Sequence, residues 1–434
     1  MKTVHILHYL IFFSITYLAG SSELLPKKEW TFMVYMAARN DLHPFSHTNI
    51  RQMADIGSNE FLNIIVNLDE RGNENPYRLY IEKDNPLIVC KNSCLTNSGD
   101  PENLIDFCKW AIEAFPAQHY ALILWDHGTG PIDPFIGRTL SFDTLLTPEI
   151  FEIQYKSFLG LLPQTTPPLQ KGICFDDEHR QYITNEGLQR ALSIICQESL
   201  NGGKLDIIGF DACLMSDIAI AHLVRDYANI MVSSQNVELG PGWNYRLTLK
   251  LFTETCPTPK EFATHMVQSY GNAYQYIIGD YTQSAIDLQA ITLLENNVHH
   301  VSTLLTQALH GQHDRTVKDA IKMSRSRRLC TAFDEPSYID LHHLYLNLSR
   351  NLPLFQQTTS SETSRIQTAL YEGLTDGMKL IESIVIANTA GSKLPNAKGI
   401  SIYFPEVRVH SSYYKIPFAL ENKWLTFVRT YLNG

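Results

Sequence analysis

The chain has 434 residues, of which 44% are hydrophobic and 18% are charged, and its formal net charge is −10. This composition is typical of a globular protein with enough apolar residues for a large core. The negative charge, and a sequence without a cluster of lysine and arginine, argue against a nucleic acid as the main partner.

The chain begins with the pattern of a secretory signal peptide. Lys2 precedes an almost continuous apolar run over residues 4–19, and small residues follow at 19–22. These features are typical of a signal that is removed on export. A single membrane anchor is the alternative, although the run is short for a spanning helix. We assign residues 1–21 to a signal peptide. We therefore expect an exported protein (secreted, periplasmic or cell-surface) with no stable membrane span after signal removal.

The next segments alternate between strand and helix. Apolar, β-rich runs at 30–38, 62–68 and 120–125 predict strands, and helices are predicted between them at 47–56 and 101–115. Strand, helix and parallel strand in succession form the βαβ pattern of an α/β fold.

A long irregular stretch interrupts this pattern at residues 131–172. It contains several prolines and no sustained periodicity, which is typical of a functional or disordered loop. Beyond it, a helix is predicted at 188–196, and strands are predicted to end at Asp211 and to run over 230–234.

Helices dominate the sequence from residue 259 onward. We predict an α/β domain over residues 23–290 and a mostly helical C-terminal region over 291–434. A late apolar strand at 399–405 is expected to return to the core of the first domain.

Two predicted strands end in residues that can carry out covalent chemistry. His127 follows the strand at 120–125, and Cys213 follows the strand that ends at Asp211. The carboxyl ends of parallel strands share one edge of the sheet, where α/β proteins bind ligands, so the two side chains can meet there. Because an imidazole stabilises a nearby thiolate, the pair indicates a nucleophilic cysteine. The backbone N–H of Gly128 can serve as an oxyanion donor beside it.

Each of these residues also has a structural interpretation. Cys213 can be an ordinary buried core residue, and His127 can be a hydrogen-bonded turn residue. Asp211 can cap the turn that follows it or pair with a cation. Position in the sequence leaves both interpretations open. No metal site is expected, because Cys90 and Cys94 have no histidine or second cysteine pair near them.

These residues lie in segments that resemble the clostripain family of cysteine peptidases, which has a caspase-like fold. The segments, in order along the chain, are W-T-F-M-V-Y-M-A-A-x-N-D-L at 30–42, L-W-D-H-G-T-G at 124–130, F-D-A-C-L-M-S at 210–216, S-Q-N-x-E-x-G-x-G-W-x-Y at 234–245 and G-I-S-I-Y-F-P at 399–405. The resemblance implies an α/β fold with a mainly parallel sheet flanked by helices. It also implies that His127 and Cys213 form a dyad that hydrolyses peptide bonds through an acyl-enzyme.

The same resemblance implies a substrate preference for Arg or Lys at P1, with Asp211 lining the S1 pocket. A carboxylate at the base of the pocket is what a basic P1 side chain requires. Relatives commonly have a second acid in the loop at 234–245. This chain has Pro241 at that position, and Glu238 is the nearby acid that can replace it.

Two further properties are implied by the resemblance alone. Members of the family often cut themselves between the histidine and the cysteine, and Arg138, Lys156 and Lys171 are the candidate positions within 131–172. Some members need calcium, but no EF-hand-like loop is present, and the acidic pairs at 69–70 and 176–177 are sparse. We expect no other cofactor.

The combined prediction is an exported cysteine endopeptidase that cleaves protein or peptide substrates after Arg or Lys. Two alternatives would use the same fold. One is a transpeptidase that passes the acyl group to an amine instead of water. The other is a binding or adhesion protein that has lost turnover, for which the missing loop acid is the supporting observation.

Overall fold

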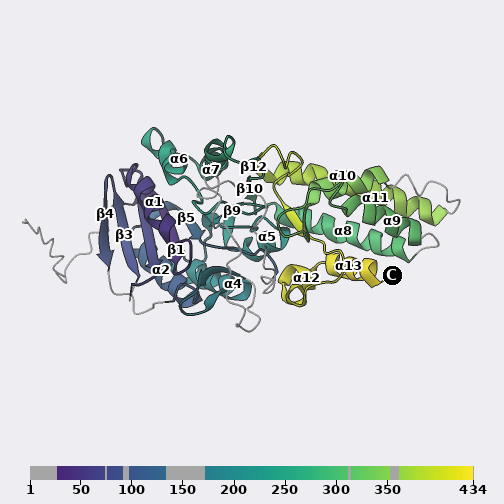
Figure 1. Ribbon diagram of the computed structural model, residues 1–434, viewed down its shortest axis with the longest axis horizontal. Coiled ribbons are helices and arrows are strands. Elements are labelled where there is room, and N and C mark those ends of the chain that lie inside the picture. The colour runs from purple at the N-terminus through teal and green to yellow at the C-terminus, as the bar shows by residue number, and fades with distance from the viewer. Residues whose placement is uncertain are drawn as a thin grey trace, which may run out of the picture.

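The computed structural model describes residues 27–73, 76–90, 97–132, 172–310, 314–351 and 361–433. The predicted signal peptide and almost all of the predicted irregular stretch lie outside these residues. The described chain is built on a nine-stranded sheet with the order β12-β10-β9-β8-β5-β1-β2-β3-β4 (Figure 1). Among the described residues, no helix combines the length and the apolarity that crossing a bilayer requires.

The five central strands of the sheet are parallel, as the alternation of strands and helices predicted. They are β1 (Lys28–Ala38), β2 (Leu62–Glu70), β5 (Ala117–Trp125), β8 (Leu205–Asp211) and β9 (Ala228–Ser233). Their carboxyl ends therefore lie at one edge of the sheet. This edge brings together segments that are far apart in the sequence.

Antiparallel strands extend the sheet on both sides. A hairpin of β3 (Tyr77–Glu82) and β4 (Asn85–Cys90) follows β2, and β10 (Thr282–Asp287) pairs with β9. The outermost strand is β12 (Val385–Ala390), which pairs with β10. The sequence analysis predicted no strand there, because this run follows a helix directly, without a glycine or proline between them.

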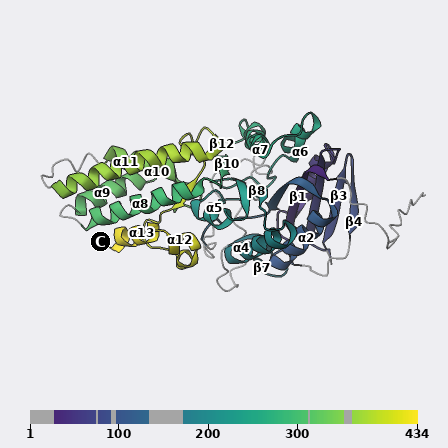
Figure 2. The ribbon, with the colours of Figure 1, turned by 180° about the vertical axis from the view of Figure 1, so that it is seen from behind.

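Helices cover both faces of the sheet, and alternate residues of β1 show why. Phe32, Val34 and Met36 belong to one apolar cluster, and Met33 and Tyr35 belong to the other. The first cluster contains residues of α1 (His43–Ala54), α6 (Tyr245–Leu249) and α7 (Pro259–Tyr274). The second contains residues of α2 (Pro101–Ala114), α4 (Asn185–Ile194) and α5 (Ile218–Val224). Figures 1 and 2 show the two layers from opposite sides.

The later part of the chain adds a helical bundle at one end of the sheet (Figure 1). Its helices are α8 (Ile291–Leu309), α9 (Asp314–Arg325), α10 (Leu341–Asn351), α11 (Ser361–Ile384), α12 (Pro417–Glu421) and α13 (Trp424–Asn433). Two small sheets complete the described elements. One pairs β6 (Gly172–Asp176) with β7 (Gln181–Thr184), and the other pairs β11 (Tyr338–Asp340) with β13 (Ser401–Tyr403).

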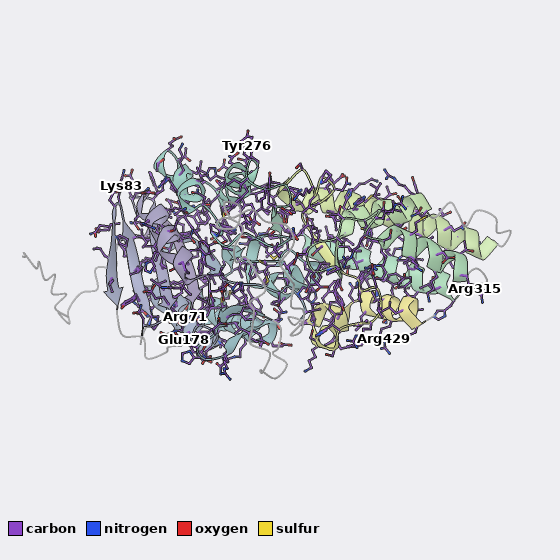
Figure 3. All side chains as sticks on the ribbon, in the orientation of Figure 1. Arg71, Lys83, Glu178, Tyr276, Arg315 and Arg429 are labelled. Atoms are coloured by element: carbon purple, nitrogen blue, oxygen red, sulfur yellow. The ribbon has the colours of Figure 1, made fainter. Side chains whose placement is uncertain are left out.

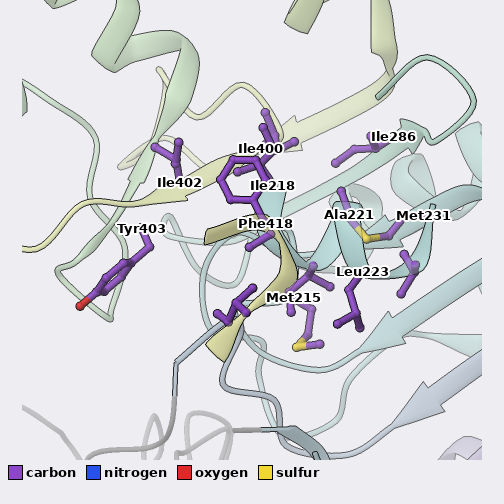
Figure 4. Close-up of a cluster of buried hydrophobic side chains, with 14 of the residues drawn as sticks. Met215, Ile218, Ala221, Leu223, Met231, Ile286, Ile400, Ile402, Tyr403 and Phe418 are labelled. Atoms are coloured by element: carbon purple, nitrogen blue, oxygen red, sulfur yellow. The ribbon is translucent and has the colours of Figure 1, made fainter. Parts of the chain in front are cut away.

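The strand β13 connects the C-terminal part of the chain to the sheet. The Ser401 backbone N–H donates a hydrogen bond to the carbonyl of Ser216, and the Ser401 hydroxyl contacts Asp217 at 3.1 Å. Figure 4 shows Ile400 and Ile402 beside Ile218 of α5, with Phe418 in the same buried cluster. Burial of apolar groups across this contact stabilises the segment that follows Cys213.

Candidate active site

The register between β5 and β8 brings the two candidate catalytic residues together. Trp125 pairs with Asp211 in this parallel ladder, and His127 and Cys213 each lie two residues beyond that pair. Both residues line one partly open cavity of about 20 Å³, together with Leu42, Asp126 and Glu238 among others. A cavity of this size holds about one water molecule. The structure therefore places His127 and Cys213 at one small site.

His127 is buried and is held by an aspartate from the neighbouring strand end. Its Nε2 lies 2.7 Å from Oδ1 of Asp41, which follows β1. Burial lowers the pKa of His127, but the hydrogen bond to Asp41 and the negative charges of Asp126, Asp41 and Asp177 outweigh it, so the net shift is upward. The ring is therefore both oriented and electrostatically prepared to accept a proton.

Asp126 fixes the backbone just before the histidine. Its Oδ1 accepts a hydrogen bond from Nδ2 of Asn40 at 2.6 Å, and its Oδ2 accepts the backbone N–H of Phe175. Burial raises the pKa of Asp126 well above its usual range, and the positive charge of His127 opposes that shift. Asn40 and Phe175 belong to different parts of the chain, so this carboxyl group ties them to the end of β5.

The thiol of Cys213 is buried under the segment that contains Glu238. The Glu238 backbone N–H donates to Sγ at 3.3 Å, and Sγ lies 3.8 Å from the Glu238 carbonyl oxygen. Burial raises the pKa of the Cys213 thiol well above its usual range, and the charges of Glu238, Asp334 and Asp211 add to the shift. In this arrangement the Cys213 thiol is protonated, and the segment that contains Glu238 covers it.

The backbone segments that follow His127 and contain Cys213 approach each other closely and leave no space for a side chain at Gly128. A Cβ atom on Gly128 would lie 2.6 Å from the carbonyl oxygen of Cys213, so only glycine fits. Leu214 has φ +64°, a left-handed conformation that side chains other than glycine rarely adopt. Its N–H donates to the carbonyl of Asn236. These features turn the chain sharply after Cys213, before α5 begins at Ile218.

Both carboxylate oxygens of Asp211 accept hydrogen bonds from the loop over 239–245. The Trp243 backbone N–H donates to Oδ1 at 3.0 Å, and the Tyr245 hydroxyl donates to Oδ2 at 2.8 Å. Gly242, with φ +62°, lies directly against this carboxylate, and its own carbonyl accepts the Tyr274 hydroxyl. Burial raises the pKa of Asp211 to about 6, against the opposing effect of these hydrogen bonds. Asp211 therefore also anchors the loop, one of the roles that its position in the sequence allowed.

Glu238 is a second buried acid at the same site. Glu238 lines the cavity with Asp211, and its carboxyl group interacts with the side chains of Asp211, Trp243 and Gln283. Burial and the negative charge of Asp211 raise the pKa of Glu238 well above its usual range. Two buried acids in contact are costly to ionise together unless a cation joins them. Pro241, by contrast, supplies only its backbone carbonyl, which accepts from Asn49.

A comparison with known proteins identifies the family. The model of the clostripain family of C11 peptidases matches residues 34–154 and 160–429. The chain belongs to the clostripain family. This confirms the resemblance seen in the sequence. Clostripain from Hathewaya histolytica is 26% identical over 178 residues, which cover 39% of this chain and 27% of that protein. The alignment thus spans about a quarter of this curated relative's length.

Solved structures confirm the α/β fold of this clostripain-family chain. A secreted C11 cysteine protease from Bacteroides thetaiotaomicron, in complex with an irreversible peptide inhibitor, has a TM-score of 0.59 and 16% identity. The match covers 92% of this chain and 99% of that one. An inactive zymogen of a C11 protease from Parabacteroides distasonis has a TM-score of 0.56 and 17% identity, over 93% and 99% of the two chains.

The acidic pairs considered for calcium do not fit that ion. Calcium takes six to eight oxygen ligands. Asp69 and Asp176 instead lie 2.6 and 3.9 Å from Arg39, whose guanidinium occupies the space between the pairs. Asp176 also accepts a hydrogen bond from the backbone N–H of His179. We derive no step of the reaction from calcium.

Asp41 is the residue near the dyad that the sequence analysis missed. It follows β1, and β1 lies next to β5 in the sheet, so its carboxylate reaches the end of β5. The signal in the sequence is the acid after the first apolar strand, in the segment A-R-N-D-L. Such an acid becomes a candidate once the order of the strands is known.

Proposed function

We propose that this clostripain-family protein is a cysteine endopeptidase in which Cys213 is the nucleophile and His127 is the general base and acid. The observation that carries the proposal is the β5–β8 register, which sets both residues two positions beyond one strand pair and into one cavity. Family membership supports the same assignment.

The reaction proposed for this pair has two stages. His127 takes the thiol proton, and Sγ of Cys213 attacks the peptide carbonyl carbon, which forms a tetrahedral oxyanion. The C–N bond then breaks, and His127 gives its proton to the departing amine. A water molecule, deprotonated by His127, next cleaves the thioester and releases the carboxylic acid. The backbone N–H groups of Gly128 and Cys213 are the proposed oxyanion donors.

We infer that the pocket beside the dyad takes an Arg or Lys side chain at P1. Asp211 and Glu238 are buried carboxyl groups that line the same cavity. A guanidinium or ammonium group would stabilise the charged forms of these two buried acids, whose pKa values burial raises. Glu238 thus replaces the second acid that relatives have at the position of Pro241.

The small volume of the cavity and the protonated thiol support a further step, in which the described form is converted to one with a larger pocket. We propose that the protein cuts itself between residues 131 and 172. Arg138, Lys156 and Lys171, the candidate positions, lie outside the described residues. The similar Parabacteroides distasonis structure is that of an inactive zymogen. N-terminal sequencing of fragments from incubated protein tests this step, and the same fragments from Cys213→Ala protein would exclude self-cleavage.

We also propose that the protein is exported. The apolar run with its basic start and small residues supports removal of residues 1–21 as a signal peptide. The similar Bacteroides thetaiotaomicron protease is described as secreted. Fractionation of producing cells, with N-terminal sequencing of the mature chain, tests export. An intact N-terminus retained in the cell would contradict it.

The decisive experiment uses a thiol-reactive peptide probe with Arg at P1. We expect the probe to label the activated wild-type protein at Cys213, as located by mass spectrometry, and peptide hydrolysis to stop when labelling is complete. Cys213→Ala should remove both labelling and hydrolysis while circular dichroism stays unchanged. Cys256→Ala is the matched control, because Cys256 is an exposed thiol and should be dispensable. Full hydrolysis by the Cys213→Ala protein would overturn the proposal.

A further inference from the structure

Two histidines and one glutamate form a cluster at the active-site edge of the sheet, outside the dyad. His43 and His47 lie one turn apart on α1, and Glu70 is the last residue of β2. One ring nitrogen of each histidine and a carboxylate oxygen of Glu70 all lie within 4.8 Å of one another. Figure 3 labels the adjacent residue Arg71 and, near it, Glu178.

The contacts inside this cluster are close, but two of its atoms are unsatisfied. Oε2 of Glu70 lies 2.9 Å from Nε2 of His47 and 3.5 Å from Nδ1 of His43. Yet Nδ1 of His43 and Oε2 of Glu70 are both buried atoms without a hydrogen-bond partner. Buried polar atoms are nearly always paired, so a group that accepts electron pairs from all three residues would satisfy the cluster.

Another residue orients the glutamate toward the histidines. Nδ2 of Asn73 donates to Oε1 of Glu70 at 2.6 Å, which leaves Oε2 directed at the two imidazoles. Carboxylates that bind metals are commonly held by such a hydrogen bond to their second oxygen. The side chain of Glu70 is only 10% exposed, whereas that of His47 is 56% exposed. Glu70 is therefore held in place inside the protein, and an ion can reach the cluster from solvent on the side of His47.

We propose that His43, His47 and Glu70 bind a divalent transition ion of the zinc class. Two imidazoles and one carboxylate form a ligand set that zinc takes, with bonds of about 2.0–2.2 Å. Tetrahedral bonds of that length separate ligand atoms by about 3.3–3.6 Å. The contact of 3.5 Å lies in this range, and the contact of 2.9 Å would lengthen slightly when an ion binds. Calcium and magnesium are excluded as the preferred ions, because they select oxygen ligands over imidazole. Water would fill the fourth position.

The position of the site connects it to the dyad. His43 is two residues after Asp41, the residue that contacts Nε2 of His127. An ion that joins the start of α1 to the end of β2 would restrict the short segment that carries Asp41. The site therefore offers a means to couple ion binding to the orientation of His127, without an ion in contact with the substrate.

The test measures binding of Zn²⁺ itself, in tag-free protein that carries Cys213→Ala so that the active-site thiol cannot compete. We expect one equivalent of Zn²⁺ by competition with a chromophoric chelator. Co²⁺, which takes similar ligands, should give visible bands of a tetrahedral site without the near-ultraviolet band of a cobalt–thiolate bond. Adding His47→Ala should weaken binding at least tenfold and remove the Co²⁺ spectrum. Because His47 is largely exposed, this change should leave the fold intact.

The matched control is His119→Ala in the same background. His119 also contacts a carboxylate, Asp206, at 3.0 Å, but among the described residues it belongs to no cluster of three ligand residues. We expect the His119→Ala protein to bind Zn²⁺ as its parent does. The proposal is overturned if the parent retains no Zn²⁺, if His47→Ala leaves the affinity unchanged, or if the Co²⁺ spectrum shows a thiolate band. None of these readouts depends on peptidase activity, so they stand apart from the proposed function.

Discussion

Nε2 of His127 lies 2.7 Å from Oδ1 of Asp41, and this contact joins the ends of the neighbouring strands β5 and β1. The carboxylate holds one ring nitrogen and raises the pKa of the imidazole. Asp41 thus acts on the proposed reaction through His127, as a positioning residue, and it need not touch the substrate.

The first prediction is that Asp41→Asn lowers kcat and moves the titration of His127 to lower pH. A hydrogen bond to a charged group contributes about 1.5–3 kcal/mol, so we expect kcat to fall roughly tenfold to hundredfold. Because the negative charge of Asp41 raises the pKa of His127, its removal must lower that pKa. The pH profile of kcat/KM, and an NMR titration of the ring in Cys213→Ala protein, measure the shift.

A control separates this effect from a general loss of charge. Asp84 is an exposed aspartate at the turn between β3 and β4, and Asp84→Asn should change neither kcat nor the profile. An Asp41→Asn protein with wild-type kcat and an unshifted His127 would remove Asp41 from the mechanism.

The second prediction concerns the acids at the proposed S1 pocket. Two peptides that differ only in Arg or citrulline at P1 isolate the charge of the side chain from its shape. Asp211→Asn and Glu238→Gln should each lower kcat/KM for the Arg peptide at least tenfold more than for the citrulline peptide, since each removes a charge-assisted contact. Similar losses on both peptides would mean that these carboxyl groups only support the loop.

The third prediction is that Gly128→Ala reduces activity far more than stability. The added Cβ would lie 2.6 Å from the carbonyl oxygen of Cys213, so the backbones of the two residues must separate. Overpacking of this kind costs about 1–3 kcal/mol of unfolding free energy, whereas displacement of the dyad should lower kcat about a hundredfold. Thermal unfolding and peptide hydrolysis measure the two effects.

Gly373→Ala in α11 is the control for that substitution. Its Cβ would meet only side-chain atoms, those of Val301 and His300. The variant should keep full activity. Wild-type activity in the Gly128→Ala protein would show that the close approach is not required.

The fourth prediction is that Asp217 makes stability fall as pH rises. Asp217 caps α5 through the N–H of Ala219, and burial raises its pKa to about 7. Between about pH 4 and 7 the Asp217 carboxyl group is therefore protonated in the folded protein but ionised in the unfolded chain. The contribution of this proton to the free energy of unfolding is complete below about pH 4, and it is lost as pH rises through 7. Asp217→Asn keeps the cap and removes the titration.

Thermal unfolding from pH 4 to 8 tests this sign. Relative to wild type, Asp217→Asn should gain stability as pH rises, by up to a few kcal/mol. Thr184→Ala, which removes the cap of α4 without removing a titratable group, should leave the pH dependence as in wild type. A parallel pH dependence of the Asp217→Asn and wild-type proteins would show that Asp217 does not titrate in this range.

The positions of His127 and Cys213 could be predicted because each follows an apolar strand, and parallel strands end at one edge. The contact between His127 and Asp41 could not, since it depends on β1 lying beside β5 in the sheet. Burial of the Cys213 thiol depends on the segment at Glu238, which periodicity does not place. The two partners of Asp211 come from Trp243 and Tyr245, in a loop that has no repeating pattern.

The same reasoning explains why the sequence analysis did not predict the strand β12 or the proximity of His43, His47 and Glu70. Residues 385–390 form a strand because β10 offers an unpaired edge, and nothing within the segment itself interrupts the preceding helix. His43 and His47 have helical spacing, but Glu70 belongs to another strand, so the set is complete only in three dimensions. The family resemblance predicted the fold, but it did not predict individual long-range contacts such as these.

The pairing of β10 with β12 means that the helices α8 to α11 are an insertion between two adjacent strands of one sheet. A chain cut after residue 290, the boundary predicted from the sequence, would leave β10 as the outermost strand with open N–H and C=O groups. Such an edge recruits strands from other molecules. In the full chain β12 covers this edge of β10 and so protects the sheet from self-association. Because β12 is synthesised almost a hundred residues after β10, the sheet can be completed only late in synthesis.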